Sequence, residues 1–272
     1  MLKRDEVFKN MVKEKLLRRE PTIGAWLQAA NGITAEVMAK AGFDWLMVDM
    51  EHGPGDILTL LGQLQAMSAY GVVPFARAPW NDLVTIKRIL DTGVQGLLVP
   101  YVNGGQEAEE VVKACKYPPE GYRGIAPSPR AGGFGMNGMN YLSKANAEIV
   151  VMVAIETPQA VAQIDAILSV SGIDGIFVGP MDLSTSMGYF CNPSAPAVQQ
   201  AIGLIEEKVL ASGKFLGTVA SSFPQAKKLY ERGYSFIAAM SDTTSLGKIA
   251  IDTVDAFRGA FSQADATKGT AE

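Results

Sequence analysis

A cluster of ionisable residues directly follows a short apolar segment in the first quarter of the chain. Residues 45–48 are apolar, and Asp49, Glu51 and His52 come next, before a Gly-Pro pair breaks the chain. His52 is the only histidine in the sequence, so an imidazole that moves protons near neutral pH must be this one. Taken alone, His52 fits a core histidine with satisfied hydrogen bonds. Asp49, three residues earlier, could orient the ring and favours a role in proton transfer.

Two carboxylates, Glu156 and Asp182, also follow apolar segments, and neither has a basic neighbour in the sequence. Carboxylates that converge on one pocket repel each other unless a proton or a cation lies between them. A single histidine cannot supply a zinc cluster, so ions that prefer oxygen ligands, Mg²⁺ or Mn²⁺, are favoured over Co²⁺ or Zn²⁺. The alternative is that Asp182 caps a helix and Glu156 is a solvated rim residue.

The turn that contains Asp182 has a second chemical use. It reads Gly179, Pro180, Met181, Asp182, and the backbone N–H groups of the last two residues lie at the start of a predicted helical turn. Such groups bind a carboxylate or a phosphate. An ordinary strand-to-helix turn has the same sequence and stays open as the alternative.

An arginine also follows an apolar segment, at Arg77. It could neutralise an anion in the pocket, such as a developing enolate, or it could form a structural ion pair with Asp49 or Asp82. Lys87 and Lys214 do not follow apolar segments in this way, which weakens a Schiff-base mechanism.

These residues need a scaffold that brings the ends of several strands together. Short, β-branched apolar segments alternate with amphipathic segments along the chain. The predicted strands are 23–27, 45–48, 72–76, 96–100, 150–155, 175–178, 215–219 and 236–239. The predicted helices are 5–19, 35–41, 57–70, 83–91, 107–116, 159–170, 197–212, 224–232 and 245–261.

Eight strands that alternate with helices predict a (β/α)8 TIM barrel, in which active-site residues lie at the C-terminal ends of the strands. A doubly wound open sheet is the alternative, but residues 28–32 lack the Gly-rich turn expected of a dinucleotide-binding fold. We expect one barrel domain over 1–272, with a lead-in helix in 1–20 and a frayed tail at 263–272. Residues 117–139 interrupt the alternation and predict a long functional or interface loop.

The composition excludes several functional classes. The net charge of −4 and the pI of about 5.2 give no electrostatic reason for binding nucleic acid or an anionic membrane. No apolar run approaches the roughly 20 residues that span a bilayer. Cys115 and Cys191 have no metal-type spacing, which is typical of reduced thiols and predicts a cytoplasmic protein.

Five motifs occur in a fixed order and together resemble one known family. They are D-W-L-M-V-D-M-E-H-G-P at 44–54, R-A-P-W-N-D at 77–82, P-P-E-G-Y-R-G at 118–124, A-I-E-T at 154–157 and G-I-D-G-I-F-V-G-P-M-D-L-S at 172–184. Over about residues 24–250 the chain resembles the HpcH/HpaI family of class II, metal-dependent pyruvate aldolases. The nearest activity that the resemblance implies is that of a 4-hydroxy-2-oxoheptanedioate aldolase.

The resemblance implies a barrel similar to other phosphoenolpyruvate- and pyruvate-binding barrels. It implies Glu156 and Asp182 as metal ligands. It also implies that the amides of Met181 and Asp182, in the turn with Gly179 and Pro180, hold the carboxylate of pyruvate. The sequence departs from the family pattern at Ala154, where many members carry Gln. We therefore expect the substrate range or the rate to differ from that of those members.

The same resemblance implies that Arg77 steadies the keto or enolate oxygen and that His52, supported by Asp49, takes part in proton transfer. Asp91 matches a supporting acidic position, supplied either within the subunit or by a neighbour. Members of the family commonly form hexamers that exchange a C-terminal helix, so a homo-oligomer is expected.

The resulting hypothesis is reversible aldol cleavage of a 4-hydroxy-2-oxo acid into pyruvate and an aldehyde, through an enolate stabilised by the metal ion. Two alternatives stay open. One is an acyl-CoA lyase that resembles the citrate-lyase β-subunit and malyl-CoA lyase branch. The other is a barrel that binds a 2-oxo acid without turnover. The aldehyde partner, the stereochemistry and the preferred metal do not follow from the sequence.

Overall fold

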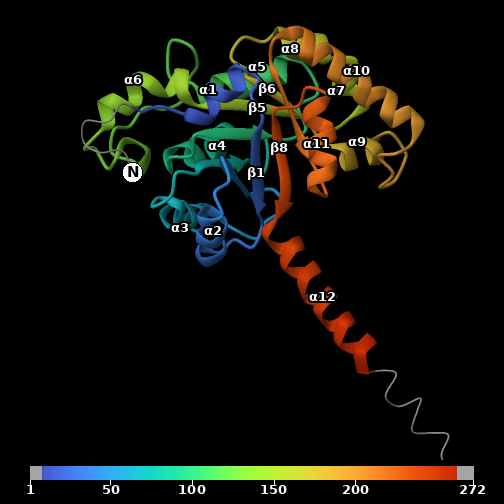
Figure 1. The fold of residues 1–272 in the computed structure, drawn as a ribbon. Coiled ribbons are helices and arrows are strands. Elements are labelled where there is room, and N and C mark those ends of the chain that lie inside the picture. The colour runs from blue at the N-terminus through green and yellow to red at the C-terminus, as the bar shows by residue number, and fades with distance from the viewer. Residues whose placement is uncertain (1–7, 262–272) are drawn as a thin grey trace, which may run out of the picture.

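The computed structural model describes residues 8–261, and its eight parallel strands form one closed barrel in sequence order. Figure 1 shows neighbouring β1 and β8 running in the same direction, and the register of these two strands closes the ring. The TIM barrel prediction is therefore confirmed. The strands are β1 (Thr22–Leu27), β2 (Trp45–Asp49), β3 (Val73–Arg77), β4 (Gly96–Val99), β5 (Val150–Ile155), β6 (Gly175–Val178), β7 (Phe215–Val219) and β8 (Phe236–Ser241).

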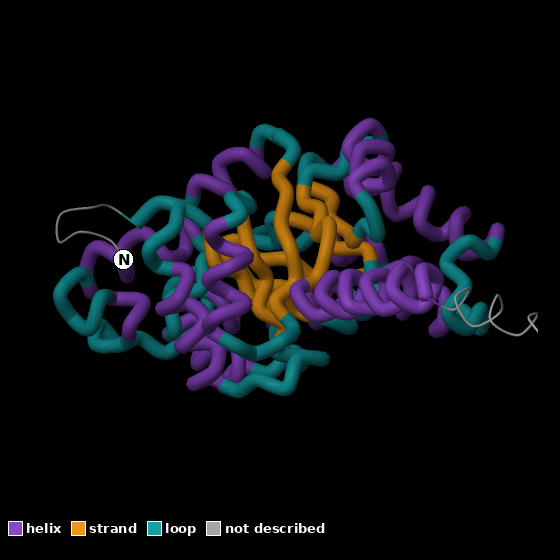
Figure 2. Tube along the Cα trace, turned by 60° about the horizontal axis from the view of Figure 1, so that its bottom comes forward, coloured by secondary structure: helices purple, strands orange, loops and turns teal. Residues whose placement is uncertain are grey.

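The helices lie around the barrel, as Figure 2 shows, except for the last, which projects from it in Figure 1. They are α1 (Met11–Leu17), α2 (Gly32–Lys40), α3 (Ile57–Met67), α4 (Leu83–Asp91), α5 (Gly105–Cys115), α6 (Gly138–Glu148), α7 (Pro158–Ala162), α8 (Ile164–Ser169), α9 (Pro180–Ser186), α10 (Pro196–Ser212), α11 (Phe223–Glu231) and α12 (Asp242–Phe261).

The observed helices depart most clearly from the predicted ones at two places. The predicted helix 159–170 is two short helices that meet at Gln163, and α6 lies where no helix was predicted. Residues 5–7 and the predicted tail at 263–272 lie outside the described residues.

The side chains of the strands form two apolar layers, as expected when both faces of a parallel sheet are covered. The outer layer packs against the helices, and the inner layer fills the barrel. In the inner layer the Trp45 and Phe236 rings stack with centroids 3.6 Å apart, and Phe75 packs against both. The interior is thus a packed core that gives the strand ends a rigid base.

Glycines in three strands make room for these rings. A Cβ on Gly24 would lie 2.1 Å from the Trp45 ring, and one on Gly96 would lie 2.0 Å from Phe75. A Cβ on Gly175 would likewise lie 2.3 Å from the Phe215 ring. No side chain fits at such distances, so each glycine is required by the large ring beside it.

Helix α1 closes the N-terminal end of the barrel. Val12 and Leu16 belong to the interior cluster, and the buried Lys13 Nζ donates to Ile149 O at 2.8 Å and to Asp174 Oδ2 at 3.0 Å. The lead-in helix predicted for residues 5–19 therefore exists over Met11–Leu17. The opposite, C-terminal end of the barrel is left as the open face.

Helix α12 projects away from the barrel in Figure 1 instead of packing on its wall. Apolar side chains along its length are mostly exposed, including Leu246, Ile249, Phe257 and Phe261. Within residues 8–261, no helix is long and apolar enough to cross a membrane.

Candidate active site

Arg77 and Asp49 occupy paired positions at the ends of β3 and β2. Arg77 Nε donates to Asp49 Oδ1 at 2.9 Å, and Nη2 donates to Asp49 Oδ2 at 2.6 Å. Nη1 lies 2.9 Å from Glu51 Oε2, and the guanidinium carbon lies 4.6 Å from the centre of the Trp26 ring. Arg77 is therefore fixed on several sides, and the ion pair predicted with Asp49 exists. Asp82 instead caps α4 through the N–H of Thr85.

Asp49 is buried and ionised. Burial opposes its charge, but the hydrogen bonds and the positive charge of Arg77 outweigh this effect and lower the pKa of Asp49 below its ordinary value. Asp49 Oδ2 also accepts from Gln28 Nε2 at 2.9 Å, and Oδ1 accepts from the backbone N–H groups of Glu51 and His52. The side chain of Asp49 thus folds the turn that follows β2.

The His52 ring lies at the rim, where its side chain is 62% exposed. The carboxylate that faces it belongs to Glu51, whose Oε1 is 4.0 Å from His52 Nε2. The described contacts from Asp49 reach the backbone of His52 rather than its ring. The support from Asp49 is therefore indirect, through the turn.

Glu156 follows β5 and is only 3% exposed. Its Oε2 accepts a hydrogen bond from the backbone N–H of Tyr101 at 3.0 Å. Burial, helped by the negative charges of Asp182 and Glu51, raises the pKa of Glu156 to about 7. A Cβ on Gly179 would lie 2.7 Å from Glu156 Oε1, so glycine is needed where the backbone of this turn passes the carboxylate.

Asp182 is partly buried in the first turn of α9, which begins with Pro180. The backbone N–H groups of Met181 and Asp182 belong to the first four of this helix and so cannot pair within it. Leu183 N–H already donates to Gly179 O at 2.9 Å. The predicted helical turn is confirmed, and its N-terminus at Gly179 lies beside Glu156.

A cavity of about 200 Å³ at the C-terminal end of the barrel is lined by some of these groups, whereas Asp49, Glu51 and His52 are not among its lining residues. It brings together Arg77, Glu156, Asp182, Met181 and the turn at Gly179 and Pro180, with Trp26, Gln28, Phe177 and Val219 as further walls. A larger cavity of about 500 Å³ lies elsewhere, between α3 and the loop around Arg130, and contains none of these groups. The smaller cavity is the candidate active site because the convergent charged groups line it.

Two residues discussed from the sequence have other surroundings. Asp91 ends α4, at the N-terminal side of the barrel, and its Oδ1 accepts from Arg123 Nη2 at 2.7 Å. It does not reach the cavity of its own subunit. Ala154 is fully buried in the interior cluster beside Trp26 and Phe177, so its methyl group lies on the same interior side as the cavity floor.

The residues that sequence reasoning missed act through backbone or through other side chains. Glu51 was seen in the charged cluster but had no assigned partner, and Gln28 was noted only as part of a turn. Tyr101 is the second residue after β4, so the rule of inspecting strand ends would have found it. Its contribution is a backbone N–H group, which residue type does not reveal.

Comparisons with known proteins identify relatives of this chain. A 4-hydroxy-2-oxo-heptane-1,7-dioate aldolase from Salmonella paratyphi C (strain RKS4594) is 43% identical over 241 residues, which cover 89% of this chain and 92% of that relative. A relative of the same name from Escherichia coli (strain ATCC 8739) is 43% identical over 243 residues, covering 89% of this chain and 93% of its own length.

A solved structure agrees as well. An HpcH/HpaI aldolase/citrate lyase family protein from Burkholderia cenocepacia J2315 superposes with a TM-score of 0.88 at 32% identity, covering 92% of this chain and 100% of that one. The family described as HpcH/HpaI aldolase/citrate lyase matches residues 22–248. This chain, with its strand-end carboxylates in a closed barrel, belongs to the HpcH/HpaI aldolase/citrate lyase family of enzymes.

Proposed function

We propose that this protein cleaves a 4-hydroxy-2-oxo acid reversibly into pyruvate and an aldehyde, with Mg²⁺ or Mn²⁺ as its metal ion. The observation that carries the proposal is the single cavity in which Glu156 and Asp182 accompany Arg77. Family membership and the names of the relatives support the reaction class.

The donor set fits a hard divalent cation. Glu156 is a carboxylate whose pKa is raised by burial and, to a smaller extent, by the negative charges of Asp182 and Glu51. Within residues 8–261, no three His, Cys, Asp or Glu side chains converge as a ligand set, so Glu156 and Asp182 would hold the ion as a pair. Mg²⁺ sites commonly use one or two protein carboxylates and take further oxygen ligands from water and substrate. A zinc site would need additional nitrogen or sulfur ligands.

When bound, the divalent ion would act as a Lewis acid toward the 2-oxo acid and favour the enolate. Arg77 is held by Asp49 through Nε and Nη2 and by Glu51 through Nη1, which leaves one N–H on Nη1 and one on Nη2 to donate to the oxygen that becomes negative. The free amides of Met181 and Asp182 bind the substrate carboxylate. No catalytic lysine is needed in this mechanism.

Proton transfer is the proposed role of His52. During cleavage its imidazole accepts the proton of the C4 hydroxyl, directly or through a water, as the C3–C4 bond breaks. The exposed position of the ring lets this proton exchange with solvent, and protonation at C3 completes pyruvate. Asp49 contributes by folding the turn that carries His52.

We propose that α12 is the contact between subunits of a homo-oligomer, a hexamer by resemblance to the family. A helix with so many exposed apolar side chains loses a large hydrophobic contribution unless another chain covers it. Light scattering should give a multiple of the subunit mass, and deletion of residues 243–261 should give monomers.

A catalytic role for Asp91 would then be exercised in a neighbouring subunit. Mixing inactive Asp91→Asn and Glu156→Gln subunits should restore part of the activity if the site is shared. Both cysteines, Cys115 and Cys191, are unpaired, which fits the cytoplasm as the proposed location.

The decisive experiment needs no aldehyde. Metal-free protein is mixed with pyruvate in D₂O, and the methyl signal is followed by proton NMR with and without Mg²⁺ or Mn²⁺. Metal-dependent loss of the signal is expected, abolished by Glu156→Ala and reduced by His52→Ala.

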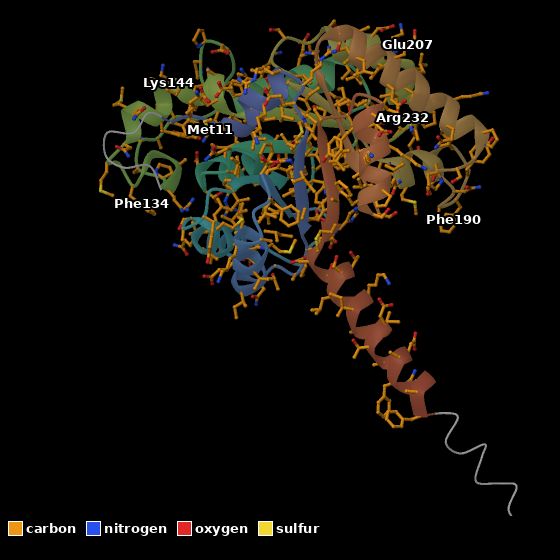
Figure 3. All side chains as sticks on the ribbon, viewed as in Figure 1. Met11, Phe134, Lys144, Phe190, Glu207 and Arg232 are labelled. Carbon is orange, nitrogen blue, oxygen red and sulfur yellow. The ribbon has the colours of Figure 1, made fainter. Side chains whose placement is uncertain are left out.

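Glu207→Ala is the matched control, because Glu207 is an exposed carboxylate on α10, at the outer surface in Figure 3. Folded protein that catalyses no exchange with any divalent ion would contradict the proposal. Acyl-CoA thioesters would then be tested as substrates, followed by simple binding of 2-oxo acids.

A further inference from the structure

The side chain of Gln28 joins the ends of three neighbouring strands at the C-terminal end of the barrel. Gln28 is the first residue after β1, and β1 lies between β2 and β8 in the closed sheet. Its Nε2 donates to Asp49 Oδ2 at 2.9 Å, and its Oε1 accepts from Ser241 Oγ at 2.8 Å. Asp49 ends β2 and Ser241 ends β8, so one amide connects the strands on both sides of its own.

The chemistry of these two partners fixes which way the amide faces. An ionised carboxylate such as that of Asp49 only accepts hydrogen bonds, so the NH2 group of Gln28 must face it. Ser241 donates through its hydroxyl group, so the carbonyl oxygen of the amide faces Ser241. A flipped amide would place its carbonyl oxygen against the carboxylate and would lose both hydrogen bonds. The amide of Gln28 is therefore held in one orientation.

Asp242, the first residue of α12, holds the backbone at the same position. Its Oδ1 accepts from the N–H of Gln28 at 2.8 Å, and its Oδ2 accepts from the N–H of Ala29 at 3.1 Å. Asp242 is only 8% exposed, and hydrogen bonds to a charged group are stronger where water is excluded. The backbone and the side chain of Gln28 are thus both fixed from the junction of β8 and α12.

The amide of Gln28 acts on Arg77 through the carboxylate that they share. Asp49 Oδ2 accepts from Gln28 Nε2 and also from Arg77 Nη2, the latter at 2.6 Å. A second donor on this oxygen takes up part of its negative charge and limits how the carboxylate can turn. More of the positive charge of Arg77 is then left for the cavity, which both Gln28 and Arg77 line.

We propose that Gln28 is a positioning residue of the active site, whose amide holds the Asp49 carboxylate and thereby sets Arg77 at the oxygen that becomes negative. This inference rests on the proposed aldol reaction and adds a residue that the reaction depends on. The alternative is a structural role, in which the amide only fastens β1 to β8. A positioning role changes kcat in folded protein, whereas a structural role changes the free energy of unfolding.

The first two variants replace the amide, and exchange of the pyruvate methyl protons in D₂O with Mg²⁺ is the measurement. Gln28→Met keeps the length of the side chain and removes both polar ends, so kcat for exchange should fall about tenfold. Gln28→Glu places a second carboxylate against Asp49, so a fall of about 100-fold is expected at pH 8. A larger change in KM for pyruvate than in kcat would make Gln28 a substrate contact and would overturn the proposal.

The pH profile of Gln28→Glu gives a readout that a structural role would not move. Once protonated, the introduced carboxyl group can donate to Asp49 Oδ2 in place of the amide. The neighbouring charges are Asp49 and Asp242, which favour the protonated form, and Arg77, which opposes it. The ratio of kcat in this variant to kcat in the parent should therefore rise about tenfold between pH 8 and pH 5.5.

The same ratio for Gln28→Met should not change with pH, because methionine has no group that titrates. Taking the ratio at each pH cancels the titrations that parent and variant share. A ratio for Gln28→Glu that stays flat across this range would show that the lost donor is not the cause, and the proposal would be wrong.

Tyr230→Phe is the matched structural control. Tyr230 Oη donates to Thr22 O at 2.9 Å, at the other end of β1, and Tyr230 does not line the cavity. This variant should lower the melting temperature and leave kcat for exchange unchanged. If Gln28→Met loses similar stability and also keeps the parent kcat, the amide is structural and the inference fails.

A further variant leaves Gln28 in place. Ser241→Ala combined with Thr243→Ala removes both hydroxyl donors to Gln28 Oε1, at 2.8 Å and 3.4 Å, so kcat should fall about fivefold. If the Gln28 variants do not fold, this double variant decides the question, and an unchanged kcat overturns the proposal.

Exchange by the unmodified protein separates this inference from the proposed reaction. If the parent catalyses exchange and the Gln28 variants match it, the inference alone is wrong. If the unmodified protein catalyses no exchange with any divalent ion, the aldol reaction and the inference fall together.

Discussion

At the N-terminal end of the barrel buried charges have partners of opposite sign, whereas at the C-terminal end carboxylates outnumber the cations beside them. Lys13 pairs with Asp174, and Arg123 pairs with Asp91. At the other end Arg77 faces Asp49 and Glu51, and Glu156 has only a backbone N–H as a described donor. The difference separates two kinds of buried charge, because a paired charge is compensated within the fold whereas an uncompensated carboxylate is a candidate ligand for a cation.

The largest expected effect is a loss of activity, and it tests the C-terminal end of the barrel, where carboxylates outnumber cations. Glu156→Gln keeps the volume of the side chain and removes its charge, so the proposed metal site loses one of two ligands. Metal-dependent exchange of pyruvate protons should fall by about 1,000-fold or more, because metal stabilisation of an enolate contributes several kcal/mol. Glu207→Gln provides the matched change at an exposed position. Exchange within tenfold of the parent rate would remove Glu156 from the site.

At the N-terminal end of the barrel, where the buried charges are paired, a substitution should change the stability of the protein. Arg123 is buried between Tyr117 and Tyr141 and is the described partner of Asp91. Arg123→Met removes the charge and leaves Asp91 unpaired, so the free energy of unfolding should fall by about 3 kcal/mol.

Urea denaturation measures this loss, and Arg232→Met is the comparison. Arg232 forms an ion pair with Glu206 at the surface, where a change of less than about 1 kcal/mol is expected. Equal losses in the two variants would show that burial of the Arg123 pair has no special weight.

The pH dependence of stability should distinguish the two ends in metal-free protein. The pKa of Glu156 is raised from 4.5 to about 7 in the folded state. The stability that this group contributes is therefore complete below pH 4.5 and is lost as the pH rises through 7, when the buried carboxylate must ionise. The loss amounts to about 3 kcal/mol.

Thermal unfolding of the parent and of Glu156→Gln across pH 4.5–8 isolates this effect, because the variant cannot ionise at that position. Mg²⁺ should raise the melting temperature of the parent more at pH 8 than at pH 5.5. A difference between parent and variant that does not change with pH would contradict the assignment.

The smallest expected effect concerns Glu51, which contacts Arg77 and faces His52 but does not line the cavity. Glu51→Gln keeps the size and loses the charge that holds Arg77 Nη1. The kcat for proton exchange should fall about tenfold, with KM for pyruvate changed less, because positioning rather than binding is affected. Glu51→Asp should recover part of the rate. A larger change in KM than in kcat would mean that Glu51 acts on substrate binding.

Much of the fold followed from the sequence because apolar strands and amphipathic helices differ in period. The eight strands of the barrel were predicted within a few residues. Helix α6 was missed because only Gly138, Tyr141 and Ala145 of its residues are buried and no side chain caps its start. Its stability comes from neighbours that the local sequence does not encode.

The site was predictable where a strand end carries a charged side chain, as at Arg77, Glu156 and Asp182, since parallel strands bring those ends together. The roles of these residues remain predictions. The partner of the His52 ring was less predictable, because spacing suggested Asp49. In the structure Asp49 accepts hydrogen bonds from Arg77 and from backbone amides. Which donors reach Asp49 depends on the folded structure and does not follow from sequence spacing.

The glycines that face interior rings have a consequence for how the sequence can change. Because a methyl group on Gly96 would overlap Phe75, and one on Gly24 would overlap Trp45, neither member of a pair can vary freely. The aromatic residue must first be replaced by a smaller one before the glycine beside it can be replaced by a residue with a side chain. The opposite order is blocked by the overlap. The effects of the two substitutions are therefore epistatic, and we expect these interior positions to change in pairs rather than one at a time.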